Sequence, residues 1–218
     1  MRIKRMSVST ALAVAQFAAL LLFAGMASAQ DHRWTGDVGG GYTPLVGAIG
    51  DRLDNGWHVT FGAGYNFTDK FSLGGRVLYN GFGVNQTVLT EADVPGGRAH
   101  LWAFTAEPRL KLAPSDSRIV PYVVGGVGYY RRTLEFTQPT IAPVTIFDPF
   151  FGFGTILVPA DEVIGSIVRG GIGGNAGVGF EVRLGDSGAK IFTEARFHYT
   201  DTGGLPTRMI PWTVGVRF

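Results

Sequence analysis

The sequence contains no cysteine and little charge. The absence of Cys among its 218 residues excludes a disulfide-stapled scaffold, a cysteine-ligated zinc or iron–sulfur site and a cysteine nucleophile. Asp, Glu, Lys and Arg together make up 17% of the chain, below the average of about 25%. Glycine is abundant, with 33 residues. Because glycine in a helix interior costs about 1 kcal/mol relative to alanine, this composition argues against a helical enzyme.

The first residues have the pattern of a secretory signal peptide. Three basic residues precede an apolar run, 11–26, which is followed by Ala27-Ser28-Ala29. We predict that residues 1–29 are a cleaved signal peptide and that residues 30–218 form one mature domain. The alternative of a membrane anchor is disfavoured, because the run is shorter than the about 20 residues that span a bilayer.

Loss of this leader also removes the positive charge of the chain. The leader holds three of the 19 basic residues and none of the 17 acidic ones, which leaves a net charge of −1. No basic cluster remains that would indicate a nucleic-acid partner.

Apolar and polar residues alternate with a period of two along the mature sequence, and helical periodicity is absent. In the last segment, for example, Ile210, Trp212, Val214, Val216 and Phe218 fall on one face. The alternation predicts strands of roughly ten residues, the length of a tilted transmembrane β-strand. The predicted strands are 34–43, 57–67, 71–80, 101–112, 120–132, 172–184, 190–200 and 209–218.

Connections between these strands alternate in length. Short turns are predicted at 68–69, 113–118 and 185–189, and longer loops at 44–55, 83–98, 133–167 and 201–207. Strict alternation of short turns and long loops is typical of outer-membrane barrels. We therefore predict an all-β fold, an eight-stranded antiparallel up-and-down transmembrane β-barrel. The alternative is a soluble eight-stranded barrel or sandwich.

Two features favour the membrane barrel. The face that carries Glu and Arg is rich in glycine, which suits a narrow and crowded lumen. Aromatic residues gather at the strand ends, as in the girdles at membrane interfaces. The predicted girdle residues are Trp34, Tyr42, Trp57, Phe67, Phe71, Tyr79, Tyr129, Tyr130, Tyr199, Trp212 and Phe218.

Several segments carry a family resemblance. Residues 121–129 read PYVVGGVGY, residues 176–184 read AGVGFEVRL, and 197–201 read FHYTD. They resemble strands of the small outer-membrane β-barrels of the OmpA, OmpX and opacity-protein type. The resemblance implies a bacterial outer-membrane location, with outer-membrane lipids and lipopolysaccharide and the barrel assembly machinery as partners. A terminal Phe218 that closes an alternating strand resembles the signal read by that machinery.

Charges on the predicted lumen face need partners, because an unpaired buried charge costs several kcal/mol. Three strands repeat the pattern Glu-x-Arg on this face, which indicates cross-strand ion pairs. This network has two interpretations, a gate or polar conduit and a structural plug, and we favour the plug. The predicted network residues are Arg76, Glu107, Arg109, Glu181, Arg183, Glu194 and Arg196, with Lys111 and Arg217 on the same face.

An enzymatic alternative rests on the segment around His198. Lipid A deacylases of the PagL type carry a His-x-Ser-Asn motif. Here Thr200 replaces the serine and Asp201 the asparagine, so that hydroxyl, imidazole and carboxylate form a candidate triad. We predict no catalytic residue, because the same segment matches the common strand end of non-enzymatic barrels. No cofactor is predicted, and no metal, because His58 and His100 lie on different strands without ligand spacing.

The longest predicted loop, 133–167, is apolar and aromatic. Exposed apolar patches usually mark binding, so the loop is a candidate contact for a surface ligand. Alternatively, its two flanking strands continue as a hairpin above the membrane. The sequence thus predicts a non-enzymatic protein with a structural, adhesive or narrow-pore role. Passage of small or hydrophobic solutes and lipid A hydrolysis are the alternatives.

Overall fold

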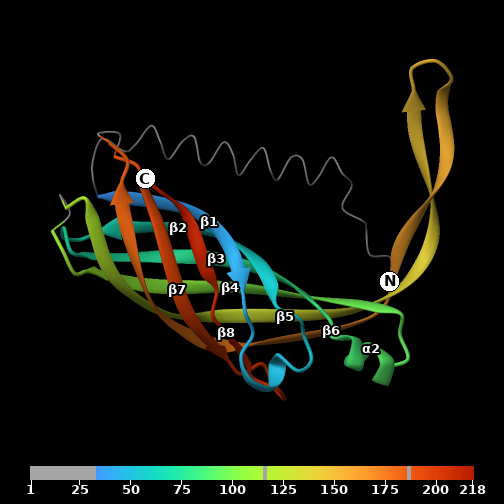
Figure 1. Ribbon diagram of the computed structural model, residues 1–218, viewed down its shortest axis with the longest axis horizontal. Coiled ribbons are helices and arrows are strands. Elements are labelled where there is room, and N and C mark those ends of the chain that lie inside the picture. Colours follow the sequence, from blue (N-terminus) through green and yellow to red (C-terminus); the bar gives the residue numbers. More distant parts are fainter. Residues whose placement is uncertain (1–32, 115–116, 186–187) are drawn as a thin grey trace.

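The structure, a computed structural model, describes residues 33–114, 117–185 and 188–218. The predicted signal peptide lies outside these ranges. The described chain forms one antiparallel sheet that curls round and closes on itself (Figure 1), and this confirms the predicted eight-stranded up-and-down barrel. Its strand segments are β1 (Trp34–Thr43), β2 (Gly56–Asn66), β3 (Phe71–Gly83), β4 (Gly96–Lys111), β5 (Ile119–Asp148), β6 (Gly152–Arg183), β7 (Lys190–Thr200), β8 (Thr207–Met209) and β9 (Trp212–Arg217).

The last two segments together make the eighth strand of the ring. β8 and β9 both pair with β7, and β9 also pairs with β1. The interruption between them falls at Ile210 and Pro211, because proline has no N–H to donate to a ladder. The carbonyl oxygen of Pro211 still accepts from the Arg196 N–H at 3.2 Å, so the strand continues in register across the break.

Alternate side chains of each strand point into the barrel and out of it, as the period-two pattern predicts. Along β4 the side chains of Leu101, Thr105 and Glu107 are buried inside the ring, whereas those of Trp102 and Phe104 are exposed outside it. The outer wall is therefore apolar, and the polar and charged side chains lie in the interior together with apolar ones such as Leu101, the arrangement of a barrel in lipid.

β5 and β6 run far beyond the other strands. They pair from Ile119 with Val182 up to Asp148 with Gly152, so residues 133–167 continue the two strands as a hairpin. The register shifts between Phe136 and Thr137. Beyond this irregularity the ribbon turns away from the barrel and projects to one side (Figure 1).

Two other predicted loops contain short helices that no periodicity indicates. Residues 44–55 include a 3₁₀ turn, Gly47–Ile49, and residues 83–98 include α2, Gln86–Glu91. Asn85 begins α2, because its side-chain oxygen accepts a hydrogen bond from the Thr87 N–H at 3.0 Å. None of the helices in the described ranges is long and apolar enough to cross a membrane.

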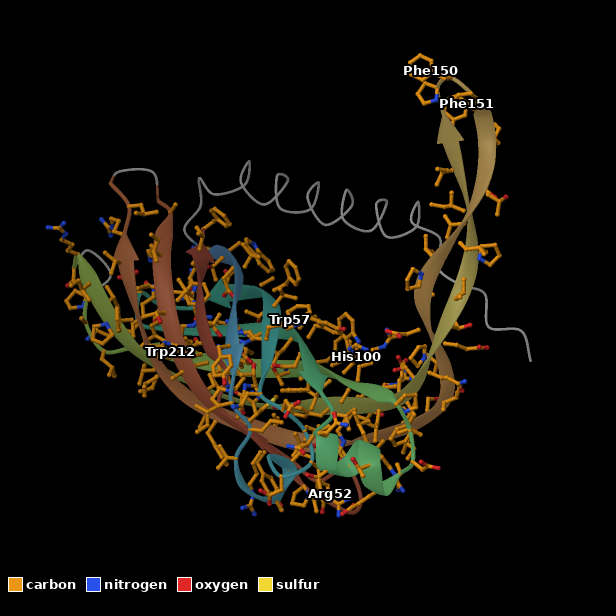
Figure 2. All side chains as sticks on the ribbon, turned by 45° about the vertical axis from the view of Figure 1, so that its right-hand side comes forward. Arg52, Trp57, His100, Phe150, Phe151 and Trp212 are labelled. Atoms are coloured by element: carbon orange, nitrogen blue, oxygen red, sulfur yellow. The ribbon has the colours of Figure 1, made fainter. Side chains whose placement is uncertain are left out.

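One predicted girdle residue lies elsewhere. The sequence between 120 and 132 is apolar on both faces, and the structure turns Val120, Tyr122, Val124 and Tyr130 inward. Tyr130 is 0% exposed, so its assignment to the girdle is wrong. Trp57 and Trp212 do lie on the outer surface (Figure 2).

Candidate functional site

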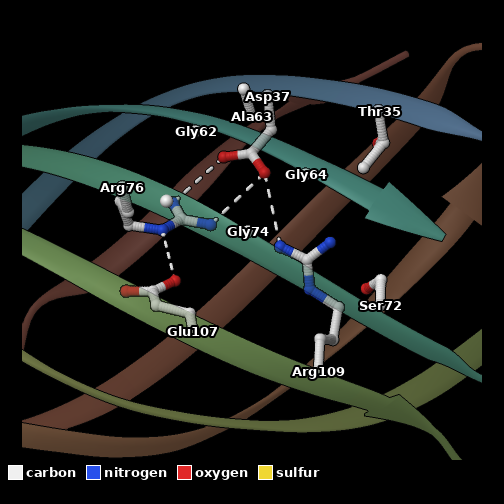
Figure 3. Close-up of a pocket in the computed structure, with 11 residues that line it drawn as sticks. Thr35, Asp37, Gly62, Ala63, Gly64, Ser72, Gly74, Arg76, Glu107 and Arg109 are labelled. Carbon is white, nitrogen blue, oxygen red and sulfur yellow. Dashed lines mark hydrogen bonds and ion pairs between the residues drawn. The ribbon is translucent and has the colours of Figure 1, made fainter. Parts of the chain in front are cut away.

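The centre of the barrel holds a chain of buried ion pairs. Arg76 lies between two carboxylates: its Nη1 is 3.0 Å from Asp37 Oδ1, and its Nε is 3.0 Å from Glu107 Oε2 (Figure 3). Glu107 Oε1 also contacts Arg196 Nη1 at 2.6 Å. Arg196 in turn pairs with Glu194 on its own strand. All these side chains are 1–4% exposed.

The chain of contacts continues toward the short-turn end of the barrel. Asp37 Oδ2 lies 3.4 Å from Arg109 Nη2 and 3.5 Å from Arg217 Nε. Arg217 Nη1 reaches Glu181 Oε2 at 2.7 Å. Glu181 Oε1 also accepts from Lys190 Nζ at 2.9 Å. Carboxylates and cations from six strands are thus joined in one connected set, which offsets the cost of their desolvation.

Glycines leave the room that this network occupies. A Cβ on Gly62 would lie 2.8 Å from Asp37 Oδ1, and one on Gly126 would lie 2.9 Å from Glu107 Cγ. A cavity of about 10 Å³ remains beside Asp37, Arg76 and Arg109, enough for about one water molecule. The glycines predicted to suit a crowded lumen therefore lie directly against its charged side chains.

Six of the seven predicted network residues meet in this set. The seventh, Arg183, is exposed. It points to the same side of β6 as Glu181, but it is the last residue of the strand and lies at the mouth of the barrel. Asp37 is a central member that the sequence pattern does not distinguish, because β1 carries no Glu-x-Arg repeat. The sequence indicates an inward position for Asp37 only through its place on the polar face of β1, beside Thr35 and Thr43.

A layer of uncharged polar groups lies on the long-loop side of the ion pairs. The ring of His58 is held between two threonines, with Thr43 Oγ1 and Thr213 Oγ1 each 2.9 Å from a ring nitrogen. Thr43 also donates to Asn80 Oδ1 at 2.7 Å. Across the lumen, the Tyr130 hydroxyl lies 2.9 Å from His198 Nδ1. The bonds around His58 join β1, β2, β3 and β9, and the Tyr130–His198 contact joins β5 and β7.

The candidate triad around His198 does not form. His198 is buried inside the barrel and its Nδ1 contacts Tyr130. The Thr200 hydroxyl donates to the Ile172 carbonyl at 3.5 Å, and the Asp201 carboxylate accepts from the Gly203 N–H at 3.0 Å. Hydroxyl, imidazole and carboxylate thus have separate partners, so this segment lacks the geometry of a nucleophile activated by a base.

The long-loop mouth of the barrel is closed by an apolar plug. Ile49, Leu53 and Leu89 come from the 3₁₀ turn, the loop after it and α2, and they pack onto inward-facing strand residues. The whole cluster is Ile49, Leu53, Leu78, Phe82, Val84, Leu89, Ala99, Leu101, Ala103, Tyr130 and Met209. The sequence did not indicate this plug, because its loop residues belong to no periodic segment.

Within the described ranges, the hairpin beyond the barrel carries the most exposed large apolar side chains. Phe150 and Phe151 at its tip are 90% and 91% exposed, and both stand far from the barrel wall (Figure 2). Phe147 and Phe153 pack on each other just below, with ring centroids 5.2 Å apart. Such a surface is unusual for a soluble protein.

No group of three or more His, Cys, Asp or Glu side chains within the described ranges is arranged to hold a metal ion. The acidic side chains of the lumen pair with Arg and Lys instead.

Comparison with known families decides the affiliation. The model of the outer membrane protein beta-barrel domain matches residues 15–218. The chain belongs to this family. Its members are proteins of the bacterial outer membrane, and that is where this barrel lies, in contact with outer-membrane lipid. By the rule for such barrels the short turns face the periplasm and the long loops face outward. The curated proteins include no match to the chain.

Three solved structures of outer-membrane proteins are similar to the chain. Neisserial surface protein A, from Neisseria, is 14% identical with a TM-score of 0.54, over 84% of this chain and 95% of that protein. Ail, the attachment invasion locus protein of Yersinia pestis, is 14% identical with a TM-score of 0.48, over 85% and 99%. The outer membrane protease OmpT of Escherichia coli is 10% identical with a TM-score of 0.38, over 85% and 93%. The family defines the fold and the membrane, and the activity is argued from this chain's own residues.

Proposed function

We propose that the protein is a closed outer-membrane anchor that presents the β5–β6 hairpin as an adhesive contact at the cell surface. The observation that carries this proposal is the exposed apolar tip, with Phe150 and Phe151 almost fully accessible on a ribbon that leaves the barrel. Binding of a partner that removes such an apolar surface from water lowers the free energy of the system.

The interior supports an anchoring role over a channel. A solute on a path along the axis would have to pass the apolar cluster around Leu89 and Phe82, then the polar layer around His58, then the ion pairs of Arg76 and Arg196. An eight-stranded barrel has room only for its own side chains. Because the apolar cluster and the ion pairs close the lumen at different levels, with the polar layer between them, a gap in one of them does not open a path for a solute.

Adhesion is tested with cells that display the protein and beads coated with octyl chains. The wild type is expected to hold cells on the beads better than a Phe150→Ser/Phe151→Ser double variant at equal surface expression. A Phe67→Ser/Phe71→Ser variant is the matched control, because these two exposed aromatic residues lie at the periplasmic end. Equal retention of wild type and tip variant would refute the adhesive role.

A further inference from the structure

Both faces of the external hairpin are apolar. Paired residues of an antiparallel ladder share a face. Phe147 pairs with Phe153 on one face, and Val144 with Ile156 on the other. All four side chains are exposed. A ribbon that lies on a water interface needs one polar face, whereas strands that read as apolar on both faces are buried on both. The hairpin is therefore suited to complete immersion in an apolar medium.

Polarity changes along the length of the hairpin. Its base carries Gln138, Asp161 and Glu162, whereas its tip carries phenylalanines. Between residues 137 and 160 the only ionisable residue is Asp148, and no Lys or Arg occurs from 133 to 168. This gradient fits entry by the tip. The lack of cations removes any attraction to anionic head groups.

Proline protects the edges of the hairpin from strand pairing. Pro139 and Pro143 lie on β5, and Pro159 lies on β6 opposite Ile141. The ladder positions of the three prolines are two residues apart, so their backbone nitrogens all point to the same side of their strands, away from the partner strand. Proline is tolerated at such positions, because the N–H that it lacks would point outward. Each edge thus lacks donors that a further strand needs, which disfavours addition of a second copy along the edge.

The position of the tip separates it from the protein's own membrane. The outer wall is apolar up to Tyr129 and then carries Arg131, Thr133 and Glu135 before the hairpin starts at Thr137. From Thr137 to Asp148 the strand extends by about 36 Å at about 3.3 Å per residue. A polar belt and this length lie between the lipid-facing wall and the tip.

We propose that the hairpin tip inserts into an apposed lipid bilayer with electrically neutral head groups. This inference rests on the proposed adhesive function and names its partner. Phe150 and Phe151 enter the acyl region first, with Phe147 and Phe153 at the interface. Asp161 and Glu162 stay in water at the base. Binding follows from burial of apolar surface and is insensitive to salt.

The test uses the full barrel in nanodiscs mixed with phosphatidylcholine vesicles, which are then floated on a density gradient. We expect the wild type to float with the vesicles equally at low and high salt. The Phe150→Ser/Phe151→Ser variant should lose at least about tenfold in affinity, given the apolar area of two phenylalanines. An Asp161→Asn/Glu162→Gln variant is the control at the base and should bind undiminished. Vesicles containing phosphatidylglycerol should bind no better.

A fluorescent probe distinguishes the possible occupants of the tip. Because the chain has no Cys, a Phe151→Cys variant accepts a single environment-sensitive dye. A blue shift that appears only when vesicles are added supports insertion into an apposed bilayer. A blue shift in nanodiscs alone overturns it in favour of the protein's own membrane, and tip-dependent dimers without vesicles overturn it in favour of a second copy. Retention on octyl beads without flotation refutes the lipid partner but leaves adhesion intact, whereas loss of both refutes adhesion itself.

Discussion

At the scale of single residues, the interior depends on carboxylates that each serve more than one cation. Glu107 contacts Arg76 and Arg196 at 3.0 and 2.6 Å, and its Oε1 also accepts from the Thr105 hydroxyl at 2.6 Å. Removal of Glu107 leaves Arg76 with Asp37 and Arg196 with Glu194, so each buried guanidinium loses one of its two carboxylates. Removal of one partner of a buried ion pair destabilises a protein by more than the intact pair stabilises it.

We expect Glu107→Ala to lower the free energy of unfolding by about 3–5 kcal/mol, the cost of breaking a buried pair. The matched control is Glu135→Ala, which removes the same group from a 2.7 Å contact with Arg98 on the outer surface. An exposed pair of this kind is worth about 0–1 kcal/mol. Urea titration of the barrel in detergent micelles measures both changes, and equal losses for the two variants would contradict the buried network.

The faces of the strands could be predicted from the sequence, but the partners in the lumen could not. Alternation places Arg76, Glu107 and Arg196 on the inner face without any structure. Which of them touch depends on the tilt and stagger of the closed sheet. Asp37 on β1 thus reaches Arg109 on β4, three strands away, and no local pattern encodes that contact.

At the scale of elements, the hairpin shows why strand ends are harder to predict than strands. The four prolines between 139 and 159 indicate an irregular loop when each is taken as a strand breaker. In the structure Pro139, Pro143 and Pro159 share one phase of the ladder, and Pro149 lies between the two strands. These prolines are compatible with a two-stranded ribbon because those within the strands occupy alternate positions of the ladder, whatever their number.

We expect Pro139→Thr/Pro143→Thr to promote self-association of the protein. The substitution supplies two N–H donors to an exposed, apolar edge of β5, and free edges of that kind template pairing with another chain. Pro114→Thr, in an exposed turn at the opposite end of the barrel, is the control. Analytical ultracentrifugation in detergent should show more dimer for the hairpin variant only. An unchanged monomer fraction would mean that the prolines do not protect the edge.

At the scale of the whole molecule, the first and last strands of the described chain close the barrel together. Phe218 exchanges backbone hydrogen bonds with Gly36 at 2.9 and 3.2 Å, and its carbonyl also accepts from the Thr35 hydroxyl at 2.9 Å. These contacts involve its backbone, and we propose that its side chain serves as the signal for the assembly machinery.

We expect Phe218→Ala to reduce insertion into the outer membrane of cells while leaving refolding of purified protein into detergent nearly unchanged. The backbone contacts with Gly36 survive this substitution, whereas a side-chain signal does not. Val214→Ala, on the same strand and also lipid-facing, is the control and should insert normally. Insertion is followed by the mobility difference between boiled and unboiled samples on a denaturing gel. A refolding defect as large as the defect in cells would assign Phe218 a structural role alone.

The apolar cluster and the ion pairs together predict that the barrel does not conduct ions. The wild type in a planar bilayer in concentrated potassium chloride should show no current steps above the empty membrane, because apolar side chains block one mouth and ion pairs block the centre. An Arg196→Ala variant should stay silent as well, since Leu89 and Phe82 still close the outer mouth. Only when Leu89→Ser and Phe82→Ser are added to Arg196→Ala should steps appear. A conducting wild type would show that the side chains do not fill the lumen, and a conducting Arg196→Ala single variant would show that the apolar cluster is no barrier.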